Sequence, residues 1–353
     1  MYKLLKIFLL IFIACFFISC KEKKAIAKAD FIIGNGQIPN IAKDKSGTIH
    51  LVYGLGDSIM YTFSSDNGQS FSSPSVVAVL PDLFSFAMRG PQIAVNNSAV
   101  IVTACTTKGD IFSYYKNRKE WKQGARVNDV DTIAKEGLMA LSAEGENAFA
   151  VWLDLRGNKR NKIYGAKSND GGKTWSENTM IYTSPDSSVC QCCKPSVTMK
   201  NNHVYVMFRN WLHGNRDLYL IQSANNGTSF EQAQKLGTGS WKLNACPMDG
   251  GGLAINENGK VQTVWRREGN IFTAVPGVPE IEIGKGRSCT IATANNQNIY
   301  AWTDNQKVIC MKAGGEKKVI GQGSLPVLKV LDNEYVICVW ENEKQIHAAV
   351  VQR

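Results

Sequence analysis

The sequence has little histidine and no segment with the periodicity of an amphipathic helix. Only four histidines occur among the 353 residues, at His50, His203, His213 and His347, and no H-E-x-x-H motif is present. Because that motif brings two zinc ligands and a general base together on one helix, its absence argues against a zinc hydrolase. No proline- or serine-rich linker divides the chain, so one domain without helices is predicted.

Clustered positive charge is also missing, although the formal net charge is +10. Outside residues 21–24 the chain has no run of lysine or arginine with interleaved aromatic residues, which argues against nucleic acid as a partner. The glycines at 250–252 are not followed by a lysine and a helix, so they do not form a phosphate-binding loop. The charge therefore identifies no partner.

The one long apolar run lies at the N-terminus. Residues 7–18 are almost entirely apolar and follow Lys3 and Lys6. A short apolar run behind two positive charges is typical of an export signal, and it is too short for a membrane span. The chain after this segment is therefore predicted to fold outside the cytoplasm.

The residues before Cys20 resemble the end of a bacterial lipoprotein signal, although Phe17 replaces the more usual leucine. The resemblance implies that residues 1–20 are a signal peptide, that Cys20 carries lipid, and that residues 21–30 are a charged tether. The alternative is an ordinary signal peptide that is cut nearby. The implied location is the cell envelope, on the outer membrane, on a membrane facing the periplasm or at the cell surface, and the membrane is then a partner through the lipid.

A unit of short apolar strands recurs along the rest of the chain. The second strand of each unit ends in an aromatic residue in six of the seven copies, which lie at residues 49–53, 100–104, 148–152, 204–208, 261–265, 298–302 and 335–340. Spacings of about 37 to 57 residues match the four-stranded blades of a β-propeller. The predicted fold is all-β, a single propeller over residues 31–353, with seven blades favoured and six the alternative. The last unit has three strands, and residues 29–37 are predicted to add the fourth and close the ring.

A turn motif of the form S-x-D-x-G-x-[ST]-[FW] occurs between the third and fourth strands of three units. The positions that define the motif are Asp66, Gly68 and Phe71 in the first copy, Asp170, Gly172 and Trp175 in the second, and Asn225, Gly227 and Phe230 in the third. The carboxylate or amide can accept backbone N–H bonds, and the glycine can adopt a positive φ. The motif resembles the Asp box, or BNR repeat, of the sialidase superfamily. That resemblance implies a propeller with these turns on its outer rim, away from the central mouth.

The sialidase resemblance also implies candidate residues at the mouth. Sialidases clamp a substrate carboxylate with three arginines, and Arg89, Arg209 and Arg266 are the candidates here. Tyr300 is the candidate nucleophile, with Glu268 as its possible activating glutamate, and Asp154 is the candidate acid. The implied function is glycan-directed: carbohydrate binding, or a diverged glycoside hydrolase of the sialidase type. The alternative is that Arg209, Arg266 and Asp154 only form ion pairs around the mouth.

The cysteines are a second group of residues that could carry chemistry. Eight cysteines follow the predicted signal peptide: Cys105, Cys190, Cys192, Cys193, Cys246, Cys289, Cys310 and Cys338. The repeat register places five of them, Cys190, Cys192, Cys193, Cys246 and Cys289, near one end of the central axis. The other three fall on second or third strands, where a buried thiol is expected.

The pattern C-x-C-C-x-P, followed by R-N, R-D and W-x-x-x-x-C-P, resembles a group of exported bacterial sialidase-like proteins without an established activity. Three alternatives remain open for the cluster. Cys246 can form a disulfide with one of the three clustered cysteines. The thiolates can bind a copper or zinc ion, with Met248 and His213 as further ligands. A single thiol can act in redox chemistry. The metal and redox alternatives predict an accessory protein. The third function is that of a structural or protein-interaction propeller, and a glycan or an envelope protein is the partner that these functions imply.

Overall fold

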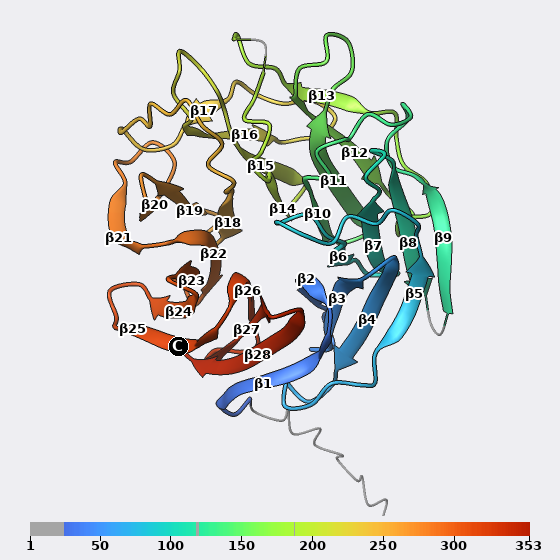
Figure 1. The fold of residues 1–353 in the computed structure, drawn as a ribbon, viewed down its shortest axis with the longest axis vertical. Coiled ribbons are helices and arrows are strands. Elements are labelled where there is room, and N and C mark those ends of the chain that lie inside the picture. The colour runs from blue at the N-terminus through green and yellow to red at the C-terminus, as the bar shows by residue number, and fades with distance from the viewer. Residues whose placement is uncertain (1–24, 118–119, 187) are drawn as a thin grey trace, which may run out of the picture.

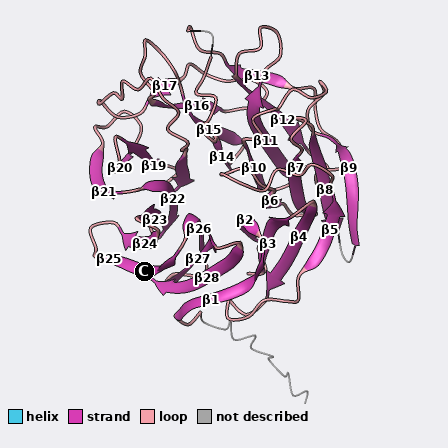
Figure 2. Cartoon of the chain, in the orientation of Figure 1, coloured by secondary structure: helices cyan, strands magenta, loops and turns pink. Residues whose placement is uncertain are grey.

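The computed structural model describes residues 25–117, 120–186 and 188–353, and these residues form a ring of seven four-stranded sheets (Figure 1). Within these ranges the regular structure is entirely β-strand (Figure 2), and none of it is a helix that could cross a membrane. The predicted signal peptide and the lipidation at Cys20 lie outside the described residues. The seven-bladed all-β prediction is confirmed.

Each of the first six blades is built from four strands that are consecutive in the sequence and antiparallel. Blade one consists of β2 (Gln37–Lys43), β3 (Ile49–Leu55), β4 (Ser58–Ser64) and β5 (Ser75–Val79), and blade two of β6 (Gln92–Val95), β7 (Val100–Cys105), β8 (Ile111–Asn117) and β9 (Glu120–Arg126). Blade three consists of β10 (Met139–Glu144), β11 (Asn147–Asp154), β12 (Lys162–Ser168) and β13 (Thr179–Tyr182). Blade four consists of β14 (Ser196–Lys200), β15 (His203–Arg209), β16 (Leu218–Ser223) and β17 (Gln234–Lys235). Blade five consists of β18 (Gly251–Ile255), β19 (Val261–Arg267), β20 (Asn270–Ala274) and β21 (Ile281–Lys285), and blade six of β22 (Arg287–Ala294), β23 (Gln297–Asp304), β24 (Lys307–Lys312) and β25 (Lys317–Gln322).

Blade seven joins the two ends of the described chain. It contains β26 (Ser324–Val330), β27 (Tyr335–Asn342) and β28 (Gln345–Gln352), and its outer strand is β1 (Lys28–Asn35). Strand β1 pairs antiparallel with β28, which confirms the predicted closure and leaves no gap in the ring (Figure 1). The predicted tether is too long, because Ala25 is already buried in the core and the strand begins at Lys28.

The core consists of apolar layers between neighbouring blades. The aromatic residues at the ends of the second strands fill these layers, and Trp152, Trp302 and Trp340 are almost completely buried. Three turns between third and fourth strands share one hydrogen-bond pattern, in which a serine Oγ accepts the N–H of the turn glycine at 2.9 Å. The glycines Gly68, Gly172 and Gly227 have φ values of 77 to 83°, and the side chains of Phe71, Trp175 and Phe230 pack on the inter-blade clusters.

The innermost strand of each blade runs along the central axis. These strands are β2, β6, β10, β14, β18, β22 and β26, and Figure 1 shows them surrounding the centre of the ring. Because every blade has the same strand order, all seven innermost strands start at the same end of the axis. The loops that precede them therefore meet there, and this end is called the mouth below.

Candidate functional site

The cysteine cluster lies at the mouth, in the loops that lead into blades four and five. Residues 189–195 come directly before β14, and residues 244–250 come directly before β18. The first loop is held by backbone bonds, since the Cys190 N–H donates to the Arg209 carbonyl at 3.0 Å and Val189 forms a bridge with Asn210. The repeat register therefore placed these cysteines correctly.

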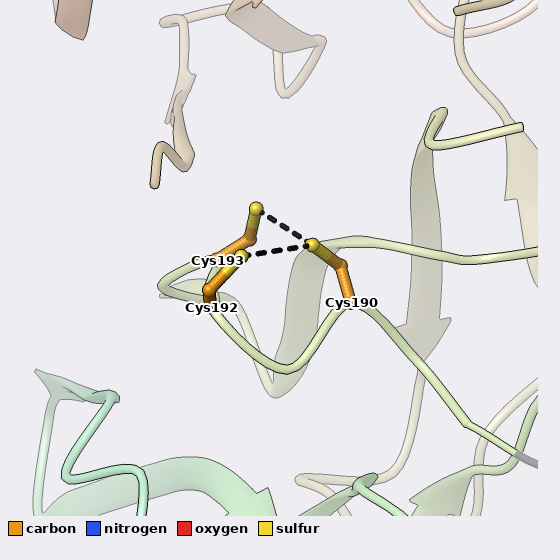
Figure 3. A group of neighbouring side chains, drawn as sticks. All are labelled: Cys190, Cys192 and Cys193. Carbon is orange, nitrogen blue, oxygen red and sulfur yellow. Dashed lines mark hydrogen bonds between the residues drawn. The ribbon is translucent and has the colours of Figure 1, made fainter. Parts of the chain in front are cut away.

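Three sulfur atoms of this cluster face one another (Figure 3). The Cys190 Sγ lies 2.9 Å from the Cys193 Sγ and 3.7 Å from the Cys192 Sγ. All three lie within 4.8 Å of one another, and their side chains are buried, with exposed fractions of 1%, 2% and 5% for Cys190, Cys193 and Cys192. The cluster thus offers sulfur ligands at one point away from bulk water.

One member of the cluster is already bonded. Cys192 forms a disulfide with Cys246, across 54 residues of sequence. The bridge links the loops of blades four and five, and Cys246 is exposed while Cys192 is buried. Cys190 and Cys193 remain as free thiols. The structure therefore combines the predicted inter-blade bridge with a separate pair of thiols.

Two buried arginines hold positive charge against this pair. Arg216 donates from Nη1 to the Cys190 Sγ at 3.1 Å and lies over the Trp211 ring at 5.0 Å. Arg209, which is 2% exposed, donates to the carbonyls of Arg216 and Arg266 at 2.7 and 2.8 Å. Both guanidinium groups are fixed by these bonds, so their charge stays beside the sulfur atoms.

The electrostatic environment makes the two thiols unequal. The hydrogen bond between the Cys190 and Cys193 sulfurs lowers the pKa of Cys190 to about 6, and the charges of Arg209 and Arg216 lower it further. Burial raises the pKa of Cys193, and the neighbouring Cys190 sulfur raises it further. Cys190 is therefore the more acidic thiol of the pair, and Cys193 is the thiol that holds its proton more strongly.

Met248 and Asp249 complete the site from the loop before β18. Met248 packs against the three clustered cysteines, and Arg287 donates to its carbonyl at 3.2 Å. The Asp249 side chain is buried and accepts the Gly250 N–H at 2.8 Å, and Arg266 lies 3.7 Å away. Burial raises the pKa of Asp249, while these partners favour its charged form.

A cavity of about 240 Å³ opens on the axis beside the cluster. It is lined by the starts of all seven innermost strands, including Gln92, Lys194 and Asp249. The Lys194 Nζ donates to the Gln92 Oε1 at 2.9 Å, and burial lowers the pKa of Lys194 to about 8. A Cβ at Gly250 would lie 2.7 Å from the Lys194 carbonyl oxygen, so this glycine permits the close approach of the two loops.

The three predicted clamp arginines all have partners within the protein. Arg209 and Arg266 share the Trp241 ring, at 5.4 and 5.5 Å, but neither is joined by a contact to Arg89 in the described residues. Arg89 instead donates to the Glu136 carbonyl at 2.6 Å. At 2% exposure the Arg209 side chain is too buried to clamp a substrate, and part of the Arg89 guanidinium is used by the Glu136 carbonyl.

The other two predicted catalytic residues have structural partners as well. Tyr300 lies in the middle of β23, where its hydroxyl contacts the Thr273 hydroxyl and the Asn298 amide at 3.0 Å. Asp154 is buried and paired with Arg156. The predicted placement of Tyr300 at the mouth is wrong because the residue faces the space between blades, and the proposed partner Glu268 sits in the exposed turn after β19.

The structure places His213 away from the cysteine cluster and Arg216 beside it. His213, the predicted extra ligand, is exposed and faces Asp186 at 3.9 Å, so it does not join the cluster. Arg216 was visible in the sequence as part of the R-D pair, but its role beside Cys190 was not predicted. The sequence signal for this role was the position of the R-D pair just before β16, because the residues at this place lie beside the loop that carries the cysteines.

No protein-family model and no curated protein sequence matches the chain. Solved structures with a similar fold include a protein of unknown function from Dyadobacter fermentans, with 13% identity, 93% of this chain and 98% of that chain covered, and a TM-score of 0.52. They also include the polysaccharide lyase Uly1, with 8% identity, 91% and 90% coverage and a TM-score of 0.54. The lectin SapL1, solved with alpha methyl fucoside, matches with 12% identity, 84% and 97% coverage and a TM-score of 0.52. At these identities the similarity is one of fold.

Proposed function

We propose that the protein binds one copper(I) ion at Cys190, Cys193 and Met248 and serves as a copper-handling accessory protein. The observation that carries the proposal is the pair of free, buried sulfur atoms 2.9 Å apart, with a methionine packed against them. Thiolate and thioether are soft ligands, and they favour copper(I) over harder ions. Binding would release the proton that the two sulfurs share.

The number of ligands favours copper over zinc. Structural zinc sites take four ligands, almost always from cysteine, histidine or carboxylate side chains. With Cys192 and Cys246 bridged, only two thiols remain in the cluster, and its third sulfur belongs to a methionine. Copper(I) is satisfied by a small set of soft ligands, so it fits this site better.

The charges around the site fit a monovalent ion. Two thiolates and one copper(I) carry a net charge of −1, which is costly to bury without compensation. Arg216 touches the Cys190 sulfur, and the Arg209 guanidinium lies close enough to lower the pKa of the same thiol. The arginines would therefore stabilise the loaded site as well as the thiolate of the free protein.

Burial favours an ion over a protein as the partner of the thiol pair. A redox protein would have to bring its own cystine into contact with sulfurs that are 1% and 2% exposed. A metal ion needs only a path for one atom. Together with the predicted export signal and lipid at Cys20, this supports a role in handling copper at the cell envelope.

A competition titration tests the proposal. Residues 21–353, exported to the periplasm, would be titrated anaerobically with copper(I) bound to a coloured chelator. We expect one ion per chain, and we expect Cys193→Ser to weaken binding by at least about tenfold. Cys310→Ala is the matched control, because this thiol is equally buried in another blade. Equal affinity in all three proteins would contradict the proposal.

A glycan-directed function is the second candidate, and the cavity at the mouth is the observation that favours it. Its polar side chains, Lys194, Gln92 and Asn40, are joined by hydrogen bonds of 2.9 and 3.1 Å and converge on the axis. A lectin and a polysaccharide lyase with this fold support the same view. A glycan array should then show binding that Lys194→Met removes, and an array without signal would count against it.

A further inference from the structure

A second cavity lies on the axis beyond the mouth, and no part of the copper proposal uses it. Its volume is about 410 Å³, and the later residues of all seven innermost strands line it. The mouth cavity is lined by the starts of the same strands. The two cavities therefore follow one another along the axis, and the second, called the far cavity below, lies toward the end opposite the cysteine cluster.

Two lysines face the far cavity from neighbouring strands. Lys43 is the last residue of β2, and Lys329 lies near the end of β26. The Lys43 ammonium donates to the Leu331 carbonyl, whereas the Lys329 ammonium makes no hydrogen bond within the described part of the chain. In the same residues neither lysine forms an ion pair with a carboxylate. The far cavity thus carries two positive charges without a counter-charge.

This arrangement is unfavourable for the empty protein. Burial lowers the pKa of Lys329, and the charge of Lys43 lowers it further, which reports the cost of holding both groups charged. Like charges repel more strongly in a cavity with a low dielectric constant than in bulk water. An anion between the two ammonium groups would remove the repulsion.

Hydroxyl groups line the same space. Thr198, Ser142 and Thr293 are among the residues that line the far cavity. A hydroxyl group can donate a hydrogen bond to an oxyanion. An oxygen-rich ligand would therefore meet polar residues as well as the two ammonium groups.

We propose that the far cavity binds a small oxyanion between Lys43 and Lys329. The chemistry is that of a phosphate, a sulfate or the carboxylate of an acidic monosaccharide, all of which present oxygens with negative charge. The cavity is large enough for a group of this size. The site is independent of the copper site, because it uses different residues at another place on the axis.

Calorimetric titration of residues 21–353 tests this proposal. The probes are inorganic phosphate, sulfate, glucuronate and, as the uncharged counterpart of glucuronate, glucose. We expect at least one anion to bind, glucose not to bind, and Lys329→Gln to weaken the anion by at least about tenfold. Lys122→Gln is the control, because it removes the same charge from an exposed position on β9.

The pattern of binding identifies the source of the oxyanion. Binding of phosphate or sulfate without glucuronate supports an inorganic ligand, and binding of glucuronate alone supports an acidic sugar. Because Lys329 is unpaired, Lys329→Gln should unfold at a temperature no lower than the wild type, so loss of binding would not reflect loss of folding. No binding of any anion, or equal weakening by Lys122→Gln, would overturn the proposal.

Discussion

The bridge between blades four and five should contribute a large share of the stability. Replacing Cys192 and Cys246 together by serine opens a loop that spans 54 residues. The entropy of closing a loop of that length corresponds to about 4 kcal/mol, and bridges commonly contribute 2–4 kcal/mol. We therefore expect the free energy of unfolding to fall by about 3 kcal/mol in the double variant.

Equilibrium unfolding in urea, followed by tryptophan fluorescence, measures this loss. Several of the eight tryptophans are buried between blades, so their emission reports the integrity of the ring. Cys310→Ala is the control for removing a buried sulfur that forms no bridge. The double variant should also become insensitive to a reducing agent, which lowers the stability of the wild type.

Copper binding in the same double variant distinguishes the stabilising role of the bridge from the metal-binding role of the free thiols. We expect copper(I) to bind with nearly unchanged affinity, because Cys190 and Cys193 remain. An unchanged urea midpoint would refute the structural role of the bridge. Loss of copper binding in a folded double variant would refute the ligand assignment, since Cys192 or Cys246 would then be a ligand.

Three further predictions concern single residues. Arg216→Met should weaken copper(I) binding by about tenfold in the competition titration, because the loaded site loses a compensating charge; unchanged affinity would show that the charge is not needed. Burial alone would raise the pKa of Glu280, but bonds from Thr238 and Arg267 hold it at about 2. The stabilisation that the Glu280 carboxylate contributes is therefore present above about pH 4.5 and is lost as the pH falls toward 2. After allowance for solvent screening, Glu280→Gln should lower the free energy of unfolding by roughly 1–2 kcal/mol at neutral pH and by progressively less in acid. A pH-independent difference in urea midpoint would contradict this. Gly172→Ala should lower stability by about 1–3 kcal/mol in thermal unfolding, because φ is +83° and the new Cβ would lie 2.7 Å from an Ile101 methyl; an unchanged melting temperature would contradict the strain.

The repeat of short strands was sufficient to predict the fold. The alternation of apolar and polar residues and the spacing of the strands reflect a burial pattern that every blade repeats. They therefore predict the strands, the blade order and the closing strand correctly. The same register placed the loops before β14 and β18 at one end of the axis. Cys105 and Cys338 on second strands and Cys310 on a third strand are also where the sequence predicted them, and all three are buried.

Side-chain direction and partners were not predictable in the same way. Arg209 and Arg89 follow strand ends or turns, as the residues of a substrate clamp do, but each is used to satisfy backbone carbonyls. Tyr300 belongs to a second strand, and only the packing of neighbouring blades decides that its hydroxyl meets Thr273. The choice of Cys192 as the bridged cysteine depends on the path of the loop within a few ångströms, which spacing does not determine.

Native mass spectrometry of residues 21–353 tests the copper(I) assignment most directly. The protein would be exported, reconstituted with copper(I) without oxygen and then sprayed under native conditions. We expect a single population with one copper per chain and a protein mass about two daltons below that of the fully reduced chain, as one bridge requires. A chain about four daltons lighter without copper would show that Cys190 and Cys193 form a second bridge, and it would contradict the metal site.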